Sequence, residues 1–264
     1  MRSFHLHDTP KDNEKGMTGN HKLSTLNAAA ILILCHVMAL LAGSEDFRTN
    51  ALTLEEIVDR MQHANREREL RLQDYEMLRT YAVHNGLTGM RAELEVRMRY
   101  KGGKKEFEVI NERGSRFLRS RVLKKLIKAE QEASGEERKQ RTEITEENYQ
   151  FSLERVAELP YGRYYVLRVK PRRKDKYLLD GLIWVIDGDF AIVQIVGRPA
   201  RRPSFWTRKI HFIHQYTKVN DFWLPASNQT EARVFLFGKS TVSVRYCGYR
   251  VNQHQPVDED CCQK

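Results

Sequence analysis

The second half of the sequence, from Tyr149 to Val251, is a series of apolar-rich segments separated by very short breaks. The breaks include PYG, RRKDK, DGD, ND and FG. Segments joined this closely pair antiparallel with their neighbours in the chain, because a parallel return needs a crossover of about a dozen residues or more. The pattern therefore predicts a long β-meander, closed or half closed.

Three further strands are predicted before the meander. Asp74–His84 and Met90–Tyr100 alternate apolar and more polar residues, which is typical of strands with one buried face. A KGGK turn then leads into a third strand at Lys105–Asn111. Together with the meander these segments give about ten strands in a single domain.

Two amphipathic helices are also expected. Thr53 followed by Glu56 has the spacing of a capping box, and the helix that it opens carries its apolar residues on one face. The second helix, Arg116–Ala133, has an apolar stripe beside many cations. The charged stretch that follows, residues 134–148, is expected to be a solvated connection.

Residues 1–44 have the layout of a secretory signal. Lys22 precedes a nearly uncharged run, Ala28–Ala42, that ends in small residues. This run is shorter than the roughly 20 residues that span a bilayer, which argues against the alternative of an uncleaved anchor. Export is therefore predicted, with translation starting at either Met1 or Met17.

Three cysteines remain after the signal: Cys247, Cys261 and Cys262. Their number is odd in a chain expected to enter an oxidising compartment. Adjacent cysteines seldom pair with each other, and none of the three has the CxxC spacing of a metal site. A disulfide between Cys247 and the tail is one of the alternatives that the sequence leaves open.

The sequence has 264 residues and a net charge of +10 at pH 7, which suits anionic partners. Export argues against nucleic acid as that partner. The segment Arg198–Lys209, RPARRPSFWTRK, mixes aromatic and cationic residues as membrane-surface segments do. A loop at the rim of the sheet that packs on its own domain is the equal alternative.

Two sets of polar residues invite a chemical interpretation, and for both a structural role is the stronger prediction. Asp187 and Asp189 flank Gly188 between apolar runs, which is a strong hairpin-turn signal. His211 and His214 are three residues apart on a predicted strand. Because side chains alternate along a strand, they are expected on opposite faces, where they cannot share a metal ion.

The arms of the hairpin around Gly188 are apolar on both faces, from Leu182 to Gly197. Antiparallel sheets usually leave one face polar, so these arms need cover on both faces. The two amphipathic helices are the natural covers. From these residues alone a fully packed core is the stronger prediction, and the alternative is incomplete cover, which would leave an apolar cavity between helix and sheet.

Motifs of the common enzyme classes are missing from the sequence. It contains no GxSxG, GxxxxGK[ST] or HExxH, and no GxGxxG after a strand. The prediction is a protein without catalytic residues, metal or cofactor. An envelope hydrolase is the weaker alternative.

The order of these elements resembles the LolA-type lipoprotein carriers and the outer-membrane lipoprotein-sorting proteins, in particular an uncharacterised bacterial subgroup. The resemblance lies in GSRFLRSRVLKKLIKAEQEA, TEENYQFSL, YYVLRVKPRRKDKYLLDGLIWVIDGDFAIVQIVGRPARRPSFWTRKIHF and DFWLPASNQTEARVFLFG, within residues 50–251. It implies a mainly β (α+β) fold, a half-open antiparallel β-barrel of about ten strands with helices over its concave face. It also implies one domain at 45–252, a flexible tail at 253–264 and a periplasmic location.

The resemblance further implies a binding protein for acyl chains of lipids or lipoproteins, carried towards the outer membrane. The alternative is a lipid-sensing regulator with a membrane-protein partner, and a membrane surface is a third candidate partner. The apolar residues expected to contact the ligand are Leu54, Ile57, Val58 and Met61 on the first helix, Val122, Leu126 and Ile127 on the second, and Trp184, Ala191 and Val193 on the sheet.

Overall fold

A computed structural model of the chain describes residues 51–132, 140–202, 207–235 and 238–252. The expected signal peptide, the choice between Met1 and Met17, the tail with Cys261 and Cys262, and the aromatic pair of the RPSFW segment lie outside these residues. Within them, no helix is both long and apolar enough to cross a membrane.

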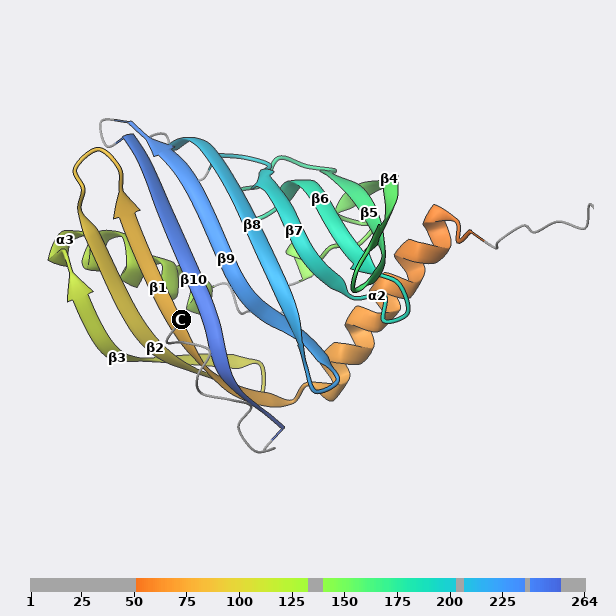
Figure 1. Ribbon diagram of the computed structural model, residues 1–264, viewed down its shortest axis with the longest axis horizontal. Helices are drawn as coiled ribbons and strands as arrows, with labels where there is room; N and C mark the ends of the chain where they lie inside the picture. Colours follow the sequence, from red (N-terminus) through yellow and green to blue (C-terminus); the bar gives the residue numbers. More distant parts are fainter. Residues whose placement is uncertain (1–50, 133–139, 203–206, 236–237, 253–264) are drawn as a thin grey trace, which may run out of the picture. The chain divides into compact units, whose positions relative to one another are not determined.

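The described residues form ten strands, and all of them belong to one antiparallel sheet (Figure 1). They are β1 (Asp74–Asn85), β2 (Arg91–Lys101), β3 (Lys104–Gly114), β4 (Tyr149–Leu159), β5 (Gly162–Pro171), β6 (Leu179–Ile186), β7 (Ile192–Pro199), β8 (Thr207–Val219), β9 (Phe222–Val234) and β10 (Gly238–Val251). Their order is β3-β2-β1-β10-β9-β8-β7-β6-β5-β4. The meander predicted from the short breaks is confirmed.

The pairing of β1 with β10 joins two groups of strands into one sheet. It runs from Tyr75 opposite Val251 to Asn85 opposite Ser240. The edge strands, β3 and β4, are not paired with each other, so the sheet stays open. The expected mainly β, half-open arrangement is confirmed, and the sheet is not a closed barrel.

Helix α2 (Leu54–Arg71) begins with the predicted capping box. The Thr53 hydroxyl accepts a hydrogen bond from the Glu56 backbone N–H, and the Glu56 carboxylate accepts one from the Thr53 N–H at 2.8 Å. These bonds satisfy two backbone donors that a helix start leaves free. They also hold the pKa of Glu56 below its usual value.

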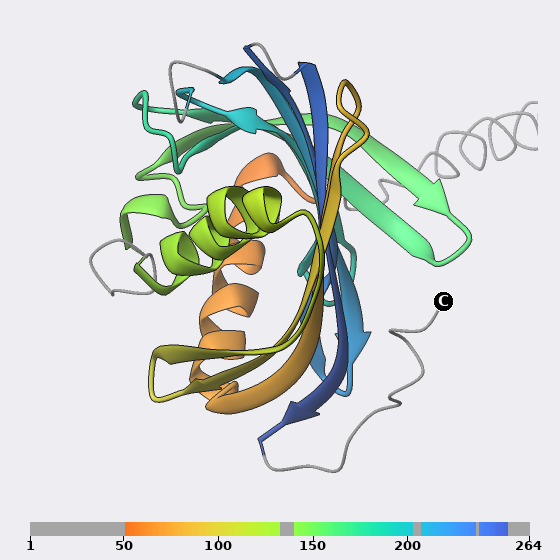
Figure 2. The same ribbon diagram turned by 90° about the vertical axis from the view of Figure 1, so that its left-hand side faces the viewer.

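The second predicted helix is present but is not a single regular helix. A short α3 (Arg116–Leu118) and α4 (Lys124–Glu132) flank a π-helical segment, η1 (Arg119–Leu123). Such wide turns are rare and are often found near functional sites. Figure 2 shows that α2 and the group formed by α3, η1 and α4, here called the helical insertion, lie on the same side of the curved sheet.

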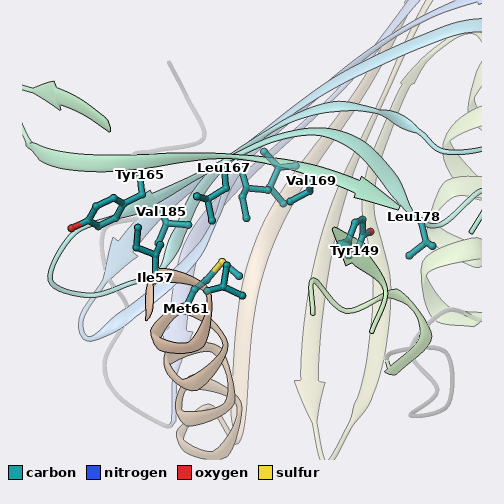
Figure 3. Packing of buried hydrophobic residues seen from close by; sticks show 11 residues of the cluster. Ile57, Met61, Tyr149, Tyr165, Leu167, Val169, Leu178 and Val185 are labelled. Carbon is teal, nitrogen blue, oxygen red and sulfur yellow. The ribbon is translucent and has the colours of Figure 1, made fainter. Parts of the chain in front are cut away.

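The concave face carries two separate apolar cores, one under each helical cover. Under α2, the side chains of Ile57, Val58 and Met61 pack against β5, β6 and β7. Figure 3 shows Ile57 and Met61 directed towards the strands that carry Leu167 and Val185. Under the helical insertion, Leu118, Leu123 and Ile127 pack against strands β1, β2 and β10. A third apolar cluster lies where β1 and β9 begin and where β2 and β10 end.

The turn between β6 and β7 is the one that the sequence predicts. Gly188 has a φ of 85°, and its backbone N–H donates to the Asp187 carboxylate. Behind the turn, Gly181 of β6 lies opposite Gly197 of β7. A Cβ on Gly181 would lie 2.1 Å from the Val196 carbonyl oxygen, so only glycine allows the two strands to approach this closely.

Cys247 lies on β10, is buried and is disulfide-bonded. The remaining cysteines fall outside the described residues. Among the described residues, no group of His, Cys, Asp and Glu side chains is arranged to hold a metal ion.

Candidate functional site

A groove of about 480 Å³ opens between α2, the β6–β7 turn and strands β7 to β9. Met61 of α2 and Ile195 of β7 lie at its base, and both belong to the apolar core under α2. Ile192, Phe222 and Ala64 add further apolar surface. Pockets of a few hundred Å³ with an apolar base are typical sites for small molecules, and this groove is of that kind.

Asp189 closes one wall of the groove by joining two hairpins. Its carboxylate accepts hydrogen bonds from Lys218 Nζ at 2.6 Å and from Trp223 Nε1 at 2.7 Å. The hydrogen bond from Lys218 is the main cause that holds the pKa of Asp189 below its usual value, and the bond from Trp223 adds to it. Asp189 is therefore a structural residue that attaches the β6–β7 turn to the β8–β9 hairpin.

Replacing Asp189 with alanine is expected to release the β6–β7 turn while leaving the fold intact. The Asp189 side chain is 40% exposed, so the free energy of unfolding should change by no more than about 1 kcal/mol. Backbone amides of the turn should exchange with solvent faster, as hydrogen-exchange mass spectrometry can measure. Unchanged exchange in this turn would show that Asp189 does not hold it.

The rim of the groove is polar and mainly acidic. Arg68 of α2 donates to the Asn65 side chain at 2.8 Å and to the Trp223 carbonyl at 3.4 Å, while its buried Nε has no partner among the described residues. The charged residues around the opening are Glu67, Glu69, Glu143, Asp189 and Asp221, with Arg68 and Arg71. Arg71 offsets part of this negative charge, because it lies 3.5 Å from Asp221.

The connection before β4 contributes to the groove wall, which contradicts the expectation of a purely solvated segment. Ile144 packs against the core under α2, and Glu143 accepts a hydrogen bond from Asn65 at 3.1 Å. Asn148 is buried, and its side-chain amide donates to the carbonyls of Gln140 and Glu143. These bonds fix residues 140–148, which a count of charged residues could not reveal.

A buried ion pair attaches the helical insertion to the concave face. Arg79 of β1 is 3% exposed and donates to Glu130 of α4 at 2.7 Å and to the Tyr81 hydroxyl at 2.9 Å. The Arg79 guanidinium also lies over the rings of Phe107 and Tyr246. Burial alone would raise the pKa of Glu130, but the charges of Arg79 and then Lys105 lower it on balance.

His211 and His214 lie on opposite faces of β8, as predicted. Phe212 packs against the core under α2, so His214, two residues on, shares the concave face. The rings of Phe212 and His214 are 5.0 Å apart. Burial lowers the pKa of His214 to about 4, so this side chain is neutral at pH 7.

The structure places the four expected ligand-contacting residues of α2 together on its inner face. Ile57, Val58 and Met61 are buried in the core, and Leu54 packs against it. Of the four, Met61 lines the groove. Ile57 and Val58 therefore contribute to core packing, and the groove begins at Met61, one helical turn further along the chain.

The other expected contacts are divided among different surroundings. Val122 and Ile127 belong to the core under the helical insertion, and Leu126 is 42% exposed. Ala191 lines the groove. Trp184 faces away from α2, where it meets Tyr164 edge-on and Arg155 lies over its ring.

Val193 sits at a bulge, and this bulge changes which β7 residues face α2. Trp184 pairs with Gln194, whereas the next residue, Val185, pairs with Ile192. Val193 is therefore the extra residue, and Ile192 and Ile195 both reach the concave side. The sequence does not show which β7 residues face α2, because both faces of the hairpin are apolar.

The groove residues that sequence reasoning missed are polar or aromatic. They include Arg68, Tyr216 and Trp223. Arg68 lies seven residues after Met61 and therefore on the same face of α2. This spacing is the sequence signal that could have identified Arg68 as a groove residue. Trp223 is the second residue of β9, and nothing in its sequence neighbourhood indicates that it contacts Asp189.

Among protein families, residues 144–250 match a family of unknown function, DUF5686. The match covers strands β4 to β10 and leaves out α2, β1 to β3 and the helical insertion. A search of curated protein sequences finds no match to this chain.

Solved structures with a similar arrangement come from several bacteria. A DUF1329 family protein from Desulfovibrio piger is 12% identical, with a TM-score of 0.40 over 77% of this chain and 93% of that one. A putative outer membrane lipoprotein-sorting protein domain from Vibrio parahaemolyticus is 12% identical, with a TM-score of 0.37 over 76% and 95%. A LolA superfamily protein from Nitrosomonas europaea is 11% identical, with a TM-score of 0.35 over 81% and 99%.

Proposed function

We propose that this protein binds acyl chains of lipids or lipoproteins in the groove beside α2, and that it does so in the periplasm as a carrier rather than as an enzyme. The observation that supports this proposal is the continuity between the groove and the core. Met61 and Ile195 belong to both, so an acyl chain in the groove extends the apolar core under α2.

Burial of hydrocarbon supplies the affinity in this proposal. Each methylene removed from water contributes about 0.8 kcal/mol, so a chain segment of several carbons binds without any polar contact. The groove is open along α2, which lets a chain enter and leave without local unfolding. Handover to a tighter site then needs no covalent step.

The acidic rim selects among head groups. The carboxylates of Glu67, Glu143 and Asp221 at the opening outnumber the guanidinium groups of Arg68 and Arg71 around them. A free fatty acid would bring a further negative charge to this rim, which costs free energy. Chains attached to a neutral head, such as an acylglycerol or the ester- and amide-linked chains of a lipopeptide, are the preferred ligands.

Filling the groove with a large side chain tests the proposal. Ala64→Trp places an indole where the acyl chain is proposed to lie, and the dissociation constant for a fluorescent monoacylglycerol should rise at least about tenfold. His63→Trp is the matched control, because His63 lies next to Ala64 on the exposed side of the same helix. It should bind the probe as the parent does.

Circular dichroism and the melting temperature check that both variants are folded. The proposal is contradicted if the parent binds no acyl probe, or if folded Ala64→Trp binds as tightly as His63→Trp. A fatty acid bound more tightly than the matching acylglycerol would contradict the proposed role of the acidic rim, but it would not contradict acyl-chain binding in the groove.

The helical insertion supports a second candidate function, that of a lipid-sensing regulator with a protein partner. Leu126 is expected to face a ligand but is 42% exposed, and Phe117 is 51% exposed on the same insertion. Apolar residues on a basic helix are features of partner surfaces. Charge reversal at Lys124 and Lys125 should then abolish capture of a membrane-protein partner while acyl-probe binding is retained.

A further inference from the structure

Three cations stand directly opposite one another across three strands of the sheet. Lys209 of β8 is paired with Arg233 of β9, and Arg233 is paired with Lys239 of β10. All three side chains are exposed. Like charges directly opposite in an antiparallel pair are destabilising, so a row of three is a costly arrangement for the folded chain.

The acidic residues nearby do not neutralise this row. Glu231 pairs with Lys239 at 2.9 Å, and Asp180 pairs with Arg198 at 2.8 Å. Lys209 and Arg233 make no ion pair with any carboxylate of the described residues. Two of the three opposed charges therefore have no internal counter-charge in the described part of the chain.

Further cations surround the row and make one continuous surface. They lie around an open recess of about 860 Å³, and the surface they form with the row is called the cationic recess here. Its members are Lys174, Arg198, Arg201, Arg202, Lys209, Arg233 and Lys239. All seven are exposed, whereas the acidic residues that line the recess are two, Asp180 and Glu231.

The cationic row of the recess lies on the other face of the sheet from the acyl groove, and the recess shares no lining residue with the groove. Lys209 and His211 alternate with Phe212, which packs against the core under α2 on the concave face. The recess also lies at the end of the sheet where β8 and β10 begin, at the top of Figure 1. A partner bound here therefore leaves the groove free.

We infer that the cationic recess is a docking surface for the phosphate head groups of an anionic lipid bilayer. A bilayer presents many phosphates in one plane, which matches seven cations distributed over several strands and the loop after β7. The apolar side chains of the recess are limited to Pro199, Ala200, Ile210 and Ala232. This lining lacks the large apolar centre typical of a protein interface.

Other anions fit the cationic recess less well. Single-stranded nucleic acid is bound on aromatic platforms, and no Phe, Tyr or Trp lines the recess among the described residues. A single small anion would contact two or three of the cations and leave the rest uncompensated. The inference does not depend on the acyl groove, because it rests on a different face and on charge alone.

Flotation with lipid vesicles tests the inference. The parent protein should bind vesicles of phosphatidylcholine mixed with phosphatidylglycerol, should not bind vesicles of phosphatidylcholine alone, and should dissociate as salt is raised. In the double variant Lys209→Gln/Arg233→Gln, the partition coefficient onto the anionic vesicles should fall at least about tenfold.

The matched control is Lys101→Gln/Lys104→Gln. These two lysines also stand directly opposite each other, are also exposed, and lie at the β2–β3 turn away from the cationic recess. Both double variants lower the net charge equally. A drop of similar size in the two would show that net charge alone drives binding, and it would overturn the inference.

Two further outcomes would also overturn it. One is the absence of parent binding to anionic vesicles, and the other is binding of inorganic phosphate or an acidic peptide that Lys209→Gln/Arg233→Gln abolishes while vesicle binding is unchanged. Acyl-probe binding separates this inference from the proposed function. Lys209→Gln/Arg233→Gln should bind the probe normally, and Ala64→Trp should still float with anionic vesicles.

Discussion

Replacing Glu130 with alanine is expected to lower the free energy of unfolding by about 3–5 kcal/mol. Arg79 is 3% exposed, and Glu130 is its only ion-pair partner among the described residues. Without that carboxylate, the guanidinium stays buried with one hydroxyl acceptor, Tyr81, and two aromatic rings. Urea denaturation followed by circular dichroism measures the change.

Glu112 provides the matched control for this experiment. It also joins a sheet strand to the helical insertion, through Arg119 at 3.1 Å and Lys124 at 2.7 Å. The side chain of Lys124 is 48% exposed, so solvent replaces much of what Glu112→Ala removes, and the loss should stay below about 1 kcal/mol. Equal losses in Glu130→Ala and Glu112→Ala would show that the burial of Arg79 does not determine how much its ion pair with Glu130 stabilises the folded state.

A double replacement separates the loss of a pair from the loss of a charge. Arg79→Met/Glu130→Met removes both members of the pair, and the charge left without its partner is Lys105, whose side chain is 26% exposed. The double variant should therefore be more stable than Glu130→Ala, since apolar residues of similar size often replace a buried ion pair at little cost. A double variant less stable than Glu130→Ala would contradict this explanation.

The protein is expected to lose about 3 kcal/mol of stability through His214 as the pH falls from about 6.5 to about 4. Burial lowers the pKa of His214 in the folded state, so the unfolded chain binds a proton in this range while the folded chain does not. Stability is therefore complete above pH 6.5, falls as the pH decreases, and levels off below about 4. Chemical denaturation at a series of pH values measures this dependence.

His214→Phe should remove this part of the pH dependence, because phenylalanine fills the space without titrating. The neighbours of His214 across the sheet, Ile195 and Asn228, carry no ionisable group. His211→Phe is the control, since His211 is exposed on the opposite face of the same strand. The same slope between pH 6.5 and 4 in parent and His214→Phe would refute the assignment.

The local architecture could be predicted because its signals are local. The capping box at Thr53 and the turn at Gly188 each depend on residues close together in the chain, and both are present as expected. The antiparallel order of the meander follows from short connections for the same reason. The pairing of β1 with β10 brings together segments more than a hundred residues apart, and no turn residue encodes it.

The groove could be predicted only in part, because it depends on which face each hairpin residue occupies. Apolar residues fill both faces of β6 and β7, so alternation alone cannot select Ile183 over Trp184 as the residue that meets α2. The bulge at Val193 then shifts the alternation within β7. The polar residues of the groove depend on contacts between elements far apart in sequence, as the bond between Asp189 and Trp223 illustrates.

The place of β10 in the sheet has a consequence for the order in which the chain can fold. It is the last of the described strands to leave the ribosome, yet it lies between β1 and β9. Until it arrives, the edge of β1 that pairs with β10 in the folded sheet has no partner. Joining the two groups of strands closes a loop of more than a hundred and fifty residues, from Tyr75 to Val251, which is a slow kind of step. The two groups of strands can therefore become one sheet only after the last described strand has been made.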